Sequence, residues 1–271
     1  MGHDDGVVLV VAHRGASGDE AEHTLGAYER AVEQGADALE CDVRLTRDGV
    51  LVCVHDRRVD RTSDGRGPVS TLELADLAEL DFRSWRTGDE LLADDPEQPD
   101  RDRDRGSVLT LERLLQLAVD ASHPVGLHIE TKHPTRYGGL VERALVDLLT
   151  RYGLATPPSR QDSRVTVMSF ASTSLRRVRL MAPALPTVLL MTRVPLRYRD
   201  GSLPPHIGIA GPALEVLTTH PRFVERAHEQ GNRVHVWTVD DPADVAYVLG
   251  LGVDAVISNH PRRVLRQLDR A

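Results

Sequence analysis

Short apolar segments rich in β-branched residues alternate with helix-like stretches along most of the chain. Residues 7–12, VVLVVA, form the first such segment, and an unbroken apolar run of this kind is typical of a strand covered on both faces in a parallel sheet. A helix-like stretch follows at residues 25–35, where Thr24 is suited to cap the start and Gly35 to end it. A helix between two strands is the βα unit of a parallel architecture.

The same alternation continues to the end of the chain. Beyond a strand-turn-strand at residues 35–56, further strands are expected at 124–132, 165–170, 187–191, 207–210, 233–240 and 254–259. Helices are expected at 110–121, 140–151, 172–181, 222–230, 242–249 and from residue 261 onward. Eight strands alternating with helices in 271 residues predict an α/β fold, with one (β/α)8 TIM-barrel domain over residues 1–271.

A long polar interval interrupts this pattern after the second strand. Residues 57–107 are rich in Asp and Arg and contain one weakly apolar helical patch at 72–80. Within the interval, residues 94–105 alternate in charge and include two prolines, which favours a solvated loop. We expect residues 57–107 to be a small insertion in the barrel, and residues 192–205 show no pattern that assigns them to an element.

The strand-turn-strand at residues 35–56 concentrates polar groups that suit chemistry. Glu40 and Asp42 are two residues apart, so on an extended strand both carboxylates point to one face while their apolar neighbours point to the other. The Asp-Gly pair that follows is typical of a tight hairpin turn. A reversal there brings His55 roughly opposite Cys41, between the two carboxylates. The hairpin therefore predicts a cation site beside a titratable histidine.

Two other strand ends carry polar groups. His13 and Arg14 follow the first apolar run, at the C-terminal end where the active sites of barrels form. Alternation along the third expected barrel strand puts His128, Glu130 and Lys132 on one face, and Glu130 is a natural third carboxylate for the site. Three carboxylates suit a hard divalent cation, Mg²⁺ or Ca²⁺, and no cysteine or histidine cluster has the spacing of a zinc site.

Charge and composition exclude several classes of protein. The formal net charge of -8 and the pI near 5.8 argue against a nucleic-acid binder. No apolar run approaches the roughly 18 residues that a membrane span needs, so we expect a cytoplasmic protein without stable membrane insertion. Cys41 and Cys53 lie on the two arms of the hairpin. A disulfide between them is geometrically conceivable, but two buried free thiols are the expectation because no signal peptide is present.

Taken together, these motifs resemble the glycerophosphodiester phosphodiesterase (GDPD) family. The resemblance is carried by AHRGAS at 12–17, by the Glu-x-Asp hairpin that ends in His55-Asp56, by LHIETK at 127–132, by SF at 169–170 and by VWTVD at 236–240. The motifs follow the family's order over nearly the full chain. Glu-x-Asp followed by Asp-Gly and His-Asp is the most specific part of this pattern.

The resemblance implies a barrel with one divalent cation at its C-terminal mouth. It gives the metal-ligand positions to Glu40, Asp42 and Glu130, and the acid and base roles to His13 and His55. An imidazole with an unperturbed pKa of about 6.5 can hold or release a proton near neutrality, so the two rings are suited to these roles.

The resemblance also suggests how a substrate is held. Arg14 and Lys132 correspond to phosphate-binding positions, and residues 57–107 correspond to the insertion that caps the site and helps to select the substrate. Trp237, on the strand expected at 233–240, is predicted to line the substrate pocket.

Three positions depart from the usual family pattern. His23 stands where the family usually has the asparagine of a Glu-Asn-Thr segment, His128 stands where an asparagine is common, and Asn259 stands in place of an aspartate. These departures bear on substrate choice and on the groups around the site more than on the reaction.

The predicted function is metal-dependent hydrolysis of small-molecule glycerophosphodiesters to glycerol 3-phosphate and an alcohol. The attacking group is either water or the glycerol 2-hydroxyl, which would give a cyclic phosphate, and the residues do not decide between them. Two alternatives stay open: a lysophospholipase D-like or cyclising phosphodiesterase that acts on lysophospholipids, and a non-catalytic phosphodiester-binding barrel. A binder needs no acid–base pair, so the presence of both histidines argues against the second.

Overall fold

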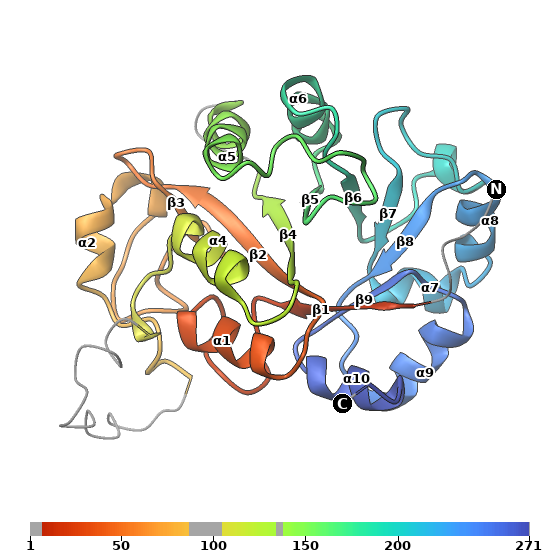
Figure 1. Ribbon diagram of the computed structural model, residues 1–271, viewed down its shortest axis with the longest axis horizontal. Helices are drawn as coiled ribbons and strands as arrows, with labels where there is room; N and C mark the ends of the chain where they lie inside the picture. Colours follow the sequence, from red (N-terminus) through yellow and green to blue (C-terminus); the bar gives the residue numbers. More distant parts are fainter. Residues whose placement is uncertain (1–6, 87–104, 134–137, 271) are drawn as a thin grey trace.

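Eight parallel strands close into a barrel in the computed structural model, which describes residues 7–86, 105–133 and 138–270 (Figure 1). β1 pairs with both β2 and β9, which closes the ring in the order β1-β9-β8-β7-β6-β5-β4-β2. The short β3 pairs antiparallel with β2 outside this ring. The predicted (β/α)8 fold is therefore confirmed. The strands are β1 (Leu9–His13), β2 (Ala38–Leu45), β3 (Leu51–Cys53), β4 (Gly126–Thr131), β5 (Val165–Ser169), β6 (Thr187–Met191), β7 (Ile209–Pro212), β8 (Arg233–Val236) and β9 (Ala255–Ser258).

Helices cover the outside of the barrel between successive strands (Figure 1). The predicted cap of the first helix is confirmed, because Thr24 Oγ1 accepts a hydrogen bond from the backbone N–H of Ala27. The α-helices are α1 (Leu25–Glu33), α2 (Leu74–Ala78), α4 (Leu111–Asp120), α5 (Leu140–Arg151), α6 (Ser172–Met181), α7 (Leu214–Thr219), α8 (Phe223–Glu229), α9 (Pro242–Gly250) and α10 (Pro261–Gln267). Two 3₁₀ turns are η1 (Val69–Thr71) and η2 (Leu196–Tyr198).

The sequence-based elements differ from the structure mainly between residues 192 and 240. α7 was not predicted, because its six residues make fewer than two turns and cannot display a helical period. β7 lies two residues beyond its expected position, at Ile209–Pro212. β8 ends at Val236 instead of residue 240, and the N–H of Leu214 then donates to the carbonyl oxygen of Trp237.

Alternation along the strands separates two apolar layers. On β4, Leu127 and Ile129 belong to the large cluster between the barrel and its helices. On β9, Ala255 and Ile257 belong to a smaller cluster with Val11 and residues of several other barrel strands, which fills the interior of the barrel. Interior positions near the C-terminal ends of the strands therefore face one common mouth.

The described part of the interval between β3 and α4 packs on its own small apolar cluster, which contains Val59 and Phe82. The helical patch predicted at 72–80 is confirmed as α2, whereas residues 94–104 of the predicted loop lie outside the described residues. Arg86 donates to backbone carbonyl oxygens of the β1–α1 loop, including that of Ser17 at 2.6 Å. This contact joins the interval to the rim of the barrel. The boundaries 57–107 stay a prediction.

Two further expectations concern thiols and membranes. Cys41 and Cys53 are both buried and free, as expected. Among the described residues, no helix has the length and apolar character needed to cross a bilayer.

Candidate active site

A cavity of about 150 Å³ opens among the C-terminal ends of the barrel strands. One side of the cavity is polar and holds six of the predicted site residues. Trp237 lies on the other side, and Asp42 contacts the lining residue Lys132 without lining the cavity itself. The other side is apolar. The lining residues are His13, Arg14, Glu40, His55, Glu130, Lys132, Met168, Phe170, Leu190, Trp237 and Ile257. The structure therefore brings the predicted residues together from three strands, β1, β2 and β4, and from the segments that follow β1, β3, β4 and β8.

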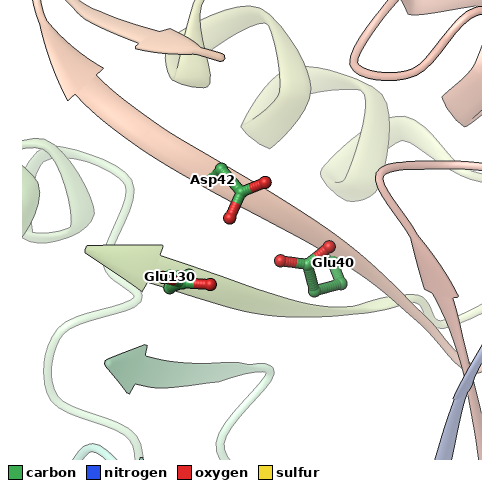
Figure 2. Close-up of side chains that lie close together, drawn as sticks. All are labelled: Glu40, Asp42 and Glu130. Atoms are coloured by element: carbon green, nitrogen blue, oxygen red, sulfur yellow. The ribbon is translucent and has the colours of Figure 1, made fainter. Parts of the chain in front are cut away.

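Three buried carboxylates converge from neighbouring strands. Glu40 and Asp42 project from β2 and Glu130 from β4, and in Figure 2 the three side chains turn toward one another. Asp42 and Glu130 are partners in the parallel register, and one oxygen of each carboxylate lies within 4.8 Å of the others. The three residues are 2%, 1% and 6% exposed. Carboxylate oxygens are the ligands that Mg²⁺ and Ca²⁺ prefer, so these residues fit a hard cation.

The ionisation of the three carboxylates differs. Burial, together with the charge of Asp42, raises the pKa of Glu40 well above its ordinary value and that of Glu130 to about 8. Burial also opposes the ionisation of Asp42. Its hydrogen bond with His23 and the charge of Lys132 nevertheless hold its pKa well below the ordinary value. Additional positive charge at the cluster would favour the ionised forms of Glu40 and Glu130.

Two cationic side chains border the carboxylates. Lys132 Nζ lies 2.8 Å from Asp42 Oδ1 and 2.9 Å from Glu130 Oε1, and Arg14 Nε lies 3.2 Å from Asp42 Oδ2. Arg14 Nη1 also donates to Glu22 Oε1 at 3.0 Å. Burial disfavours the ammonium, but Asp42 and Glu130 raise the pKa of Lys132 above its ordinary value, so the residue stays charged. Both cations line the cavity and are suited to bind phosphate oxygens.

The loop after β1 holds its residues in an unusual conformation. Arg14 and His23 have positive φ angles of 56° and 62°, and the N–H of His23 donates to the carbonyl oxygen of Arg14. Gly15 has a φ of 85°, and a Cβ there would lie only 2.7 Å from the backbone of Ala27 in α1. The loop therefore needs glycine next to Arg14. Strained backbone of this kind gathers at functional sites.

His13 is held by its Nδ1 atom, which lies 2.7 Å from Oδ1 of Asn259. Its Nε2 atom lies 4.0 Å from Glu40 Oε2, on the cavity side of the ring. Burial, together with the charge of Arg14, lowers the pKa of His13 to about 4. The imidazole is therefore neutral near pH 7, with the unprotonated Nε2 toward the cavity.

His55 is held differently. Its Nδ1 atom lies 2.6 Å from Oδ1 of Asp56, whose Oδ2 accepts from Nε of Arg61 at 2.7 Å. The hairpin pairs Val43 with Cys53, and the N–H of Val54 donates to the carbonyl oxygen of Asp42, so His55 follows directly beyond the paired residues. Burial lowers the pKa of His55, while the charge of Asp42 and the hydrogen bond to Asp56 oppose that shift.

Several residues of the site were not predicted. His23 Nε2 lies 2.9 Å from Asp42 Oδ2 and its Nδ1 lies 2.8 Å from the hydroxyl of Tyr28, so this departure from the family pattern orients a candidate metal ligand. Met168, Leu190 and Ile257 form the inner part of the apolar wall. They sit on strands made mostly of apolar residues, so nothing in the sequence distinguishes them.

Two aromatic side chains complete the apolar wall at the mouth. Phe170 and Trp237 pack edge to face with ring centroids 5.5 Å apart, and the indole N–H of Trp237 donates to the carbonyl oxygen of Gly211 at 2.7 Å. Phe170 is 45% exposed, so it forms part of the rim. The predicted position of Trp237 in the pocket wall agrees with this geometry.

Comparison with known proteins identifies the family. The model of the glycerophosphoryl diester phosphodiesterase family matches residues 13–263, which include every residue that lines the cavity. The chain belongs to this family. The membership confirms the resemblance read from the motifs and makes the chain a phosphodiesterase.

Relatives match over nearly the whole chain. The chain is 47% identical over 263 residues to a Mycobacterium tuberculosis protein named probable glycerophosphodiester phosphodiesterase 1, covering 96% of this chain and 92% of that protein. It is 34% identical over 259 residues to the glycerophosphodiester phosphodiesterase of Bacillus subtilis, covering 94% and 84%. Among solved structures, an Oleispira antarctica phosphodiesterase in complex with the product sn-glycerol-3-phosphate has the same fold, with a TM-score of 0.81, 24% identity and 96% coverage of both chains.

Proposed function

We propose that this phosphodiesterase hydrolyses glycerophosphodiesters to glycerol 3-phosphate and an alcohol in the cavity at the barrel mouth. In this proposal Glu40, Asp42 and Glu130 hold one divalent cation, Mg²⁺ or Ca²⁺. The observation that carries the proposal is that both histidines line the same cavity as Glu40 and Glu130, and the Nδ1 atom of each histidine lies beside a different partner. A phosphodiester needs charge neutralisation, a nucleophile and a protonated leaving group, and the cavity offers a group for each.

The proposed steps use the chain's own residues. Arg14 and Lys132 bind the non-bridging oxygens of the phosphate and orient the scissile bond. A divalent cation held by Glu40, Asp42 and Glu130 would supply Lewis-acid stabilisation of the charge that develops in the transition state. His13 Nε2 takes the proton from the attacking hydroxyl as the new P–O bond forms. His55 Nε2–H gives its proton to the departing oxygen as the old P–O bond breaks.

The assignment of base and acid follows from the partners of the two rings. The amide oxygen of Asn259 fixes the proton of His13 on Nδ1, while burial and the charge of Arg14 disfavour the charged ring, which suits a base. The carboxylate of Asp56 stabilises a protonated His55, which suits an acid. His55 is also 35% exposed at its side chain, so it can regain a proton from solvent after each turnover.

A second candidate is a lysophospholipase D-like or cyclising reaction on lysophospholipids. The apolar wall formed by Met168, Leu190 and Ile257 favours it, because a wholly polar substrate gains nothing from those contacts. Attack by a hydroxyl of the substrate's own glycerol would leave a cyclic phosphate, whereas attack by water would not. Phosphorus NMR of the first products separates the two reactions.

The substrate range is proposed to depend in part on residues 57–107. Arg61 joins this interval to the site, because it donates to both Asp56 and Glu22. Its guanidinium also lies over the ring of Trp85, 5.8 Å from the centroid. The interval therefore contacts the partner of His55 from outside the barrel.

The test is a coupled glycerol 3-phosphate assay over a panel of diesters, with EDTA and with Mg²⁺ or Ca²⁺ added back. Activity that EDTA abolishes and a cation restores is expected. His13→Ala and His55→Ala should abolish turnover and leave cation binding, measured by calorimetry, largely intact. His220→Ala, at an exposed histidine remote from the cavity, is the matched control. No signal with any diester would refute the proposal.

A further inference from the structure

A groove runs along the outer surface between the segment that follows β6 and the corner where α7 meets α8. It consists of two adjoining cavities of about 630 and 330 Å³, which share Val194, Arg199 and His220. α7 and α8 follow one another on one side of the barrel (Figure 1). Both cavities are larger than the cavity that holds the catalytic histidines.

The segment on one side of the groove is strongly basic in an acidic protein. Between Asp162 and Asp200 the chain carries seven arginines and no acidic residue, although its net charge is -8. Arg193, Arg197 and Arg199 are exposed, and within the described part of the chain no carboxylate oxygen lies within 4.0 Å of their guanidinium nitrogens. Their positive charge is therefore available to an anionic partner.

An apolar side chain lies among these arginines. Leu196, the first residue of η2, is 77% exposed, and Pro195 precedes it at the groove. A single exposed leucine is common on protein surfaces and carries no argument alone. A leucine flanked in sequence by arginines that form no ion pair with a described carboxylate has the composition of a surface that binds the boundary between phospholipid headgroups and acyl chains.

The position of this surface relates it to the cavity. Leu190 of β6 lines the cavity, and the basic segment leaves the same end of that strand. On the other side of the groove, α7 begins where the N–H of Leu214 donates to the carbonyl oxygen of Trp237, which also lines the cavity. The groove therefore starts at the rim of the mouth.

We propose that the η2 patch, defined as Arg193, Leu196, Arg197 and Arg199, binds the surface of an anionic phospholipid bilayer and holds the mouth of the barrel beside the lipid headgroups. The partner follows from charge complementarity, since guanidinium groups bind phosphate oxygens in pairs and Leu196 enters the acyl boundary. The binding is peripheral and needs no spanning helix. Membrane binding by this patch goes beyond the proposed function, because the protein can bind a bilayer without hydrolysing a substrate.

Vesicle co-sedimentation tests the proposal with the full chain. Vesicles of phosphatidylcholine alone are compared with vesicles that also contain phosphatidylglycerol, at low and at high salt. Binding is expected only to the anionic vesicles and is expected to weaken in high salt, because salt screens exposed charges. The triple variant R193Q/R197Q/R199Q should bind on the order of a hundredfold more weakly, at roughly fivefold for each arginine removed.

A matched pair of variants tests the apolar contact. Leu196→Asp should weaken binding, whereas Leu180→Asp should not, because Leu180 is equally exposed at 76% but lies at the far end of α6 from the mouth. All these variants should turn over a soluble diester at the wild-type rate, since none of the changed residues lines the cavity. Loss of binding with intact turnover thus separates this proposal from the proposed function.

Three results would overturn the proposal. The first is no dependence of binding on phosphatidylglycerol at low salt. The second is an equal loss of binding in the Leu180 and Leu196 variants. The third is release of the protein from vesicles by millimolar inorganic phosphate at constant ionic strength, which would indicate a site for a small phosphate ion.

Discussion

Oδ1 of the Asn259 side chain lies 2.7 Å from Nδ1 of His13, across 246 residues of sequence. The same amide donates from Nδ2 to Oδ2 of Asp240 at 2.6 Å, and the hydroxyl of Ser17 donates to Oδ1 at 2.7 Å. Because an amide oxygen only accepts, His13 carries its proton on Nδ1 and presents a lone pair on Nε2 to the cavity. Asn259 thus sets the tautomer of the proposed base.

Asn259→Ala removes this acceptor. We expect kcat to fall on the order of tenfold to hundredfold, which is part of the 10²–10⁴-fold that a positioned base contributes. KM should change little, because Asn259 does not line the cavity. Steady-state kinetics with glycerophosphocholine measures both constants. Asn232→Ala is the matched control, since the amide of Asn232 donates to the carbonyl oxygen of Gly201 and neither residue lines the cavity. Equal losses in the two variants would contradict the role of Asn259.

The different partners of the two histidines lead to a prediction about leaving groups. An aryl leaving group such as p-nitrophenol departs without a proton, whereas an alkyl alcohol needs one. His55→Ala should therefore retain much more turnover with a p-nitrophenyl diester than with glycerophosphocholine. His13→Ala should lose a similar factor with both substrates, because each needs the attacking oxygen deprotonated. Comparison of kcat for the two substrates checks the assignment, and a reversed pattern would exchange the two roles.

Much of the fold and half of the site could be predicted from the sequence. Apolar runs such as residues 7–12 reveal strands buried on both faces, and two-residue alternation places Glu40 with Asp42 because the period of a strand is fixed. The register of the hairpin follows from the Asp-Gly turn, with Leu45 paired to Leu51 and Val43 to Cys53. These inferences work because they depend only on residues close in sequence.

Contacts between distant segments could not be predicted in the same way. The hydrogen bond of Asn259 with His13 depends on β9 pairing with β1, and that of His23 with Asp42 depends on a loop with positive φ angles. Nothing in the local pattern marks Leu190 as a pocket residue, since its neighbours on β6 are equally apolar. Tertiary closure of the barrel decides these contacts.

The carboxylate cluster leads to a prediction about cations. Glu130→Gln keeps the shape of the side chain and removes one charged ligand, so the affinity for Mg²⁺ or Ca²⁺ should fall by more than about tenfold, and activity should recover at high cation concentration. Titration of activity against free cation measures the shift. Glu22→Gln is a suitable comparison, because Glu22 pairs with Arg14 and Arg61 outside the cluster. An unchanged cation dependence in Glu130→Gln would remove Glu130 from the ligand set.

A buried pair of histidines in the barrel interior is expected to lower the folding stability of the protein at acidic pH. His128 Nε2 lies 3.2 Å from His235 Nδ1, and the two side chains are 4% and 3% exposed. Burial and the proximity of His128 lower the pKa of His235 well below its ordinary value. Below about pH 6.5 the unfolded chain therefore binds a proton that the folded chain does not, so folding stability falls as the pH falls, by up to about 1.4 kcal/mol per pH unit for this group.

His235→Gln removes that titration and keeps a polar group for the contact with His128. The free energy of unfolding, measured by urea denaturation, should therefore decrease less steeply in the variant than in the wild type between pH 6.5 and pH 4. At pH 8 His235 is neutral in both the folded and the unfolded chain. The difference in free energy of unfolding between variant and wild type at that pH therefore reports only the change in packing and hydrogen bonding. A constant difference across the whole range would mean that the imidazole of His235 takes up its proton equally in the folded and unfolded chains.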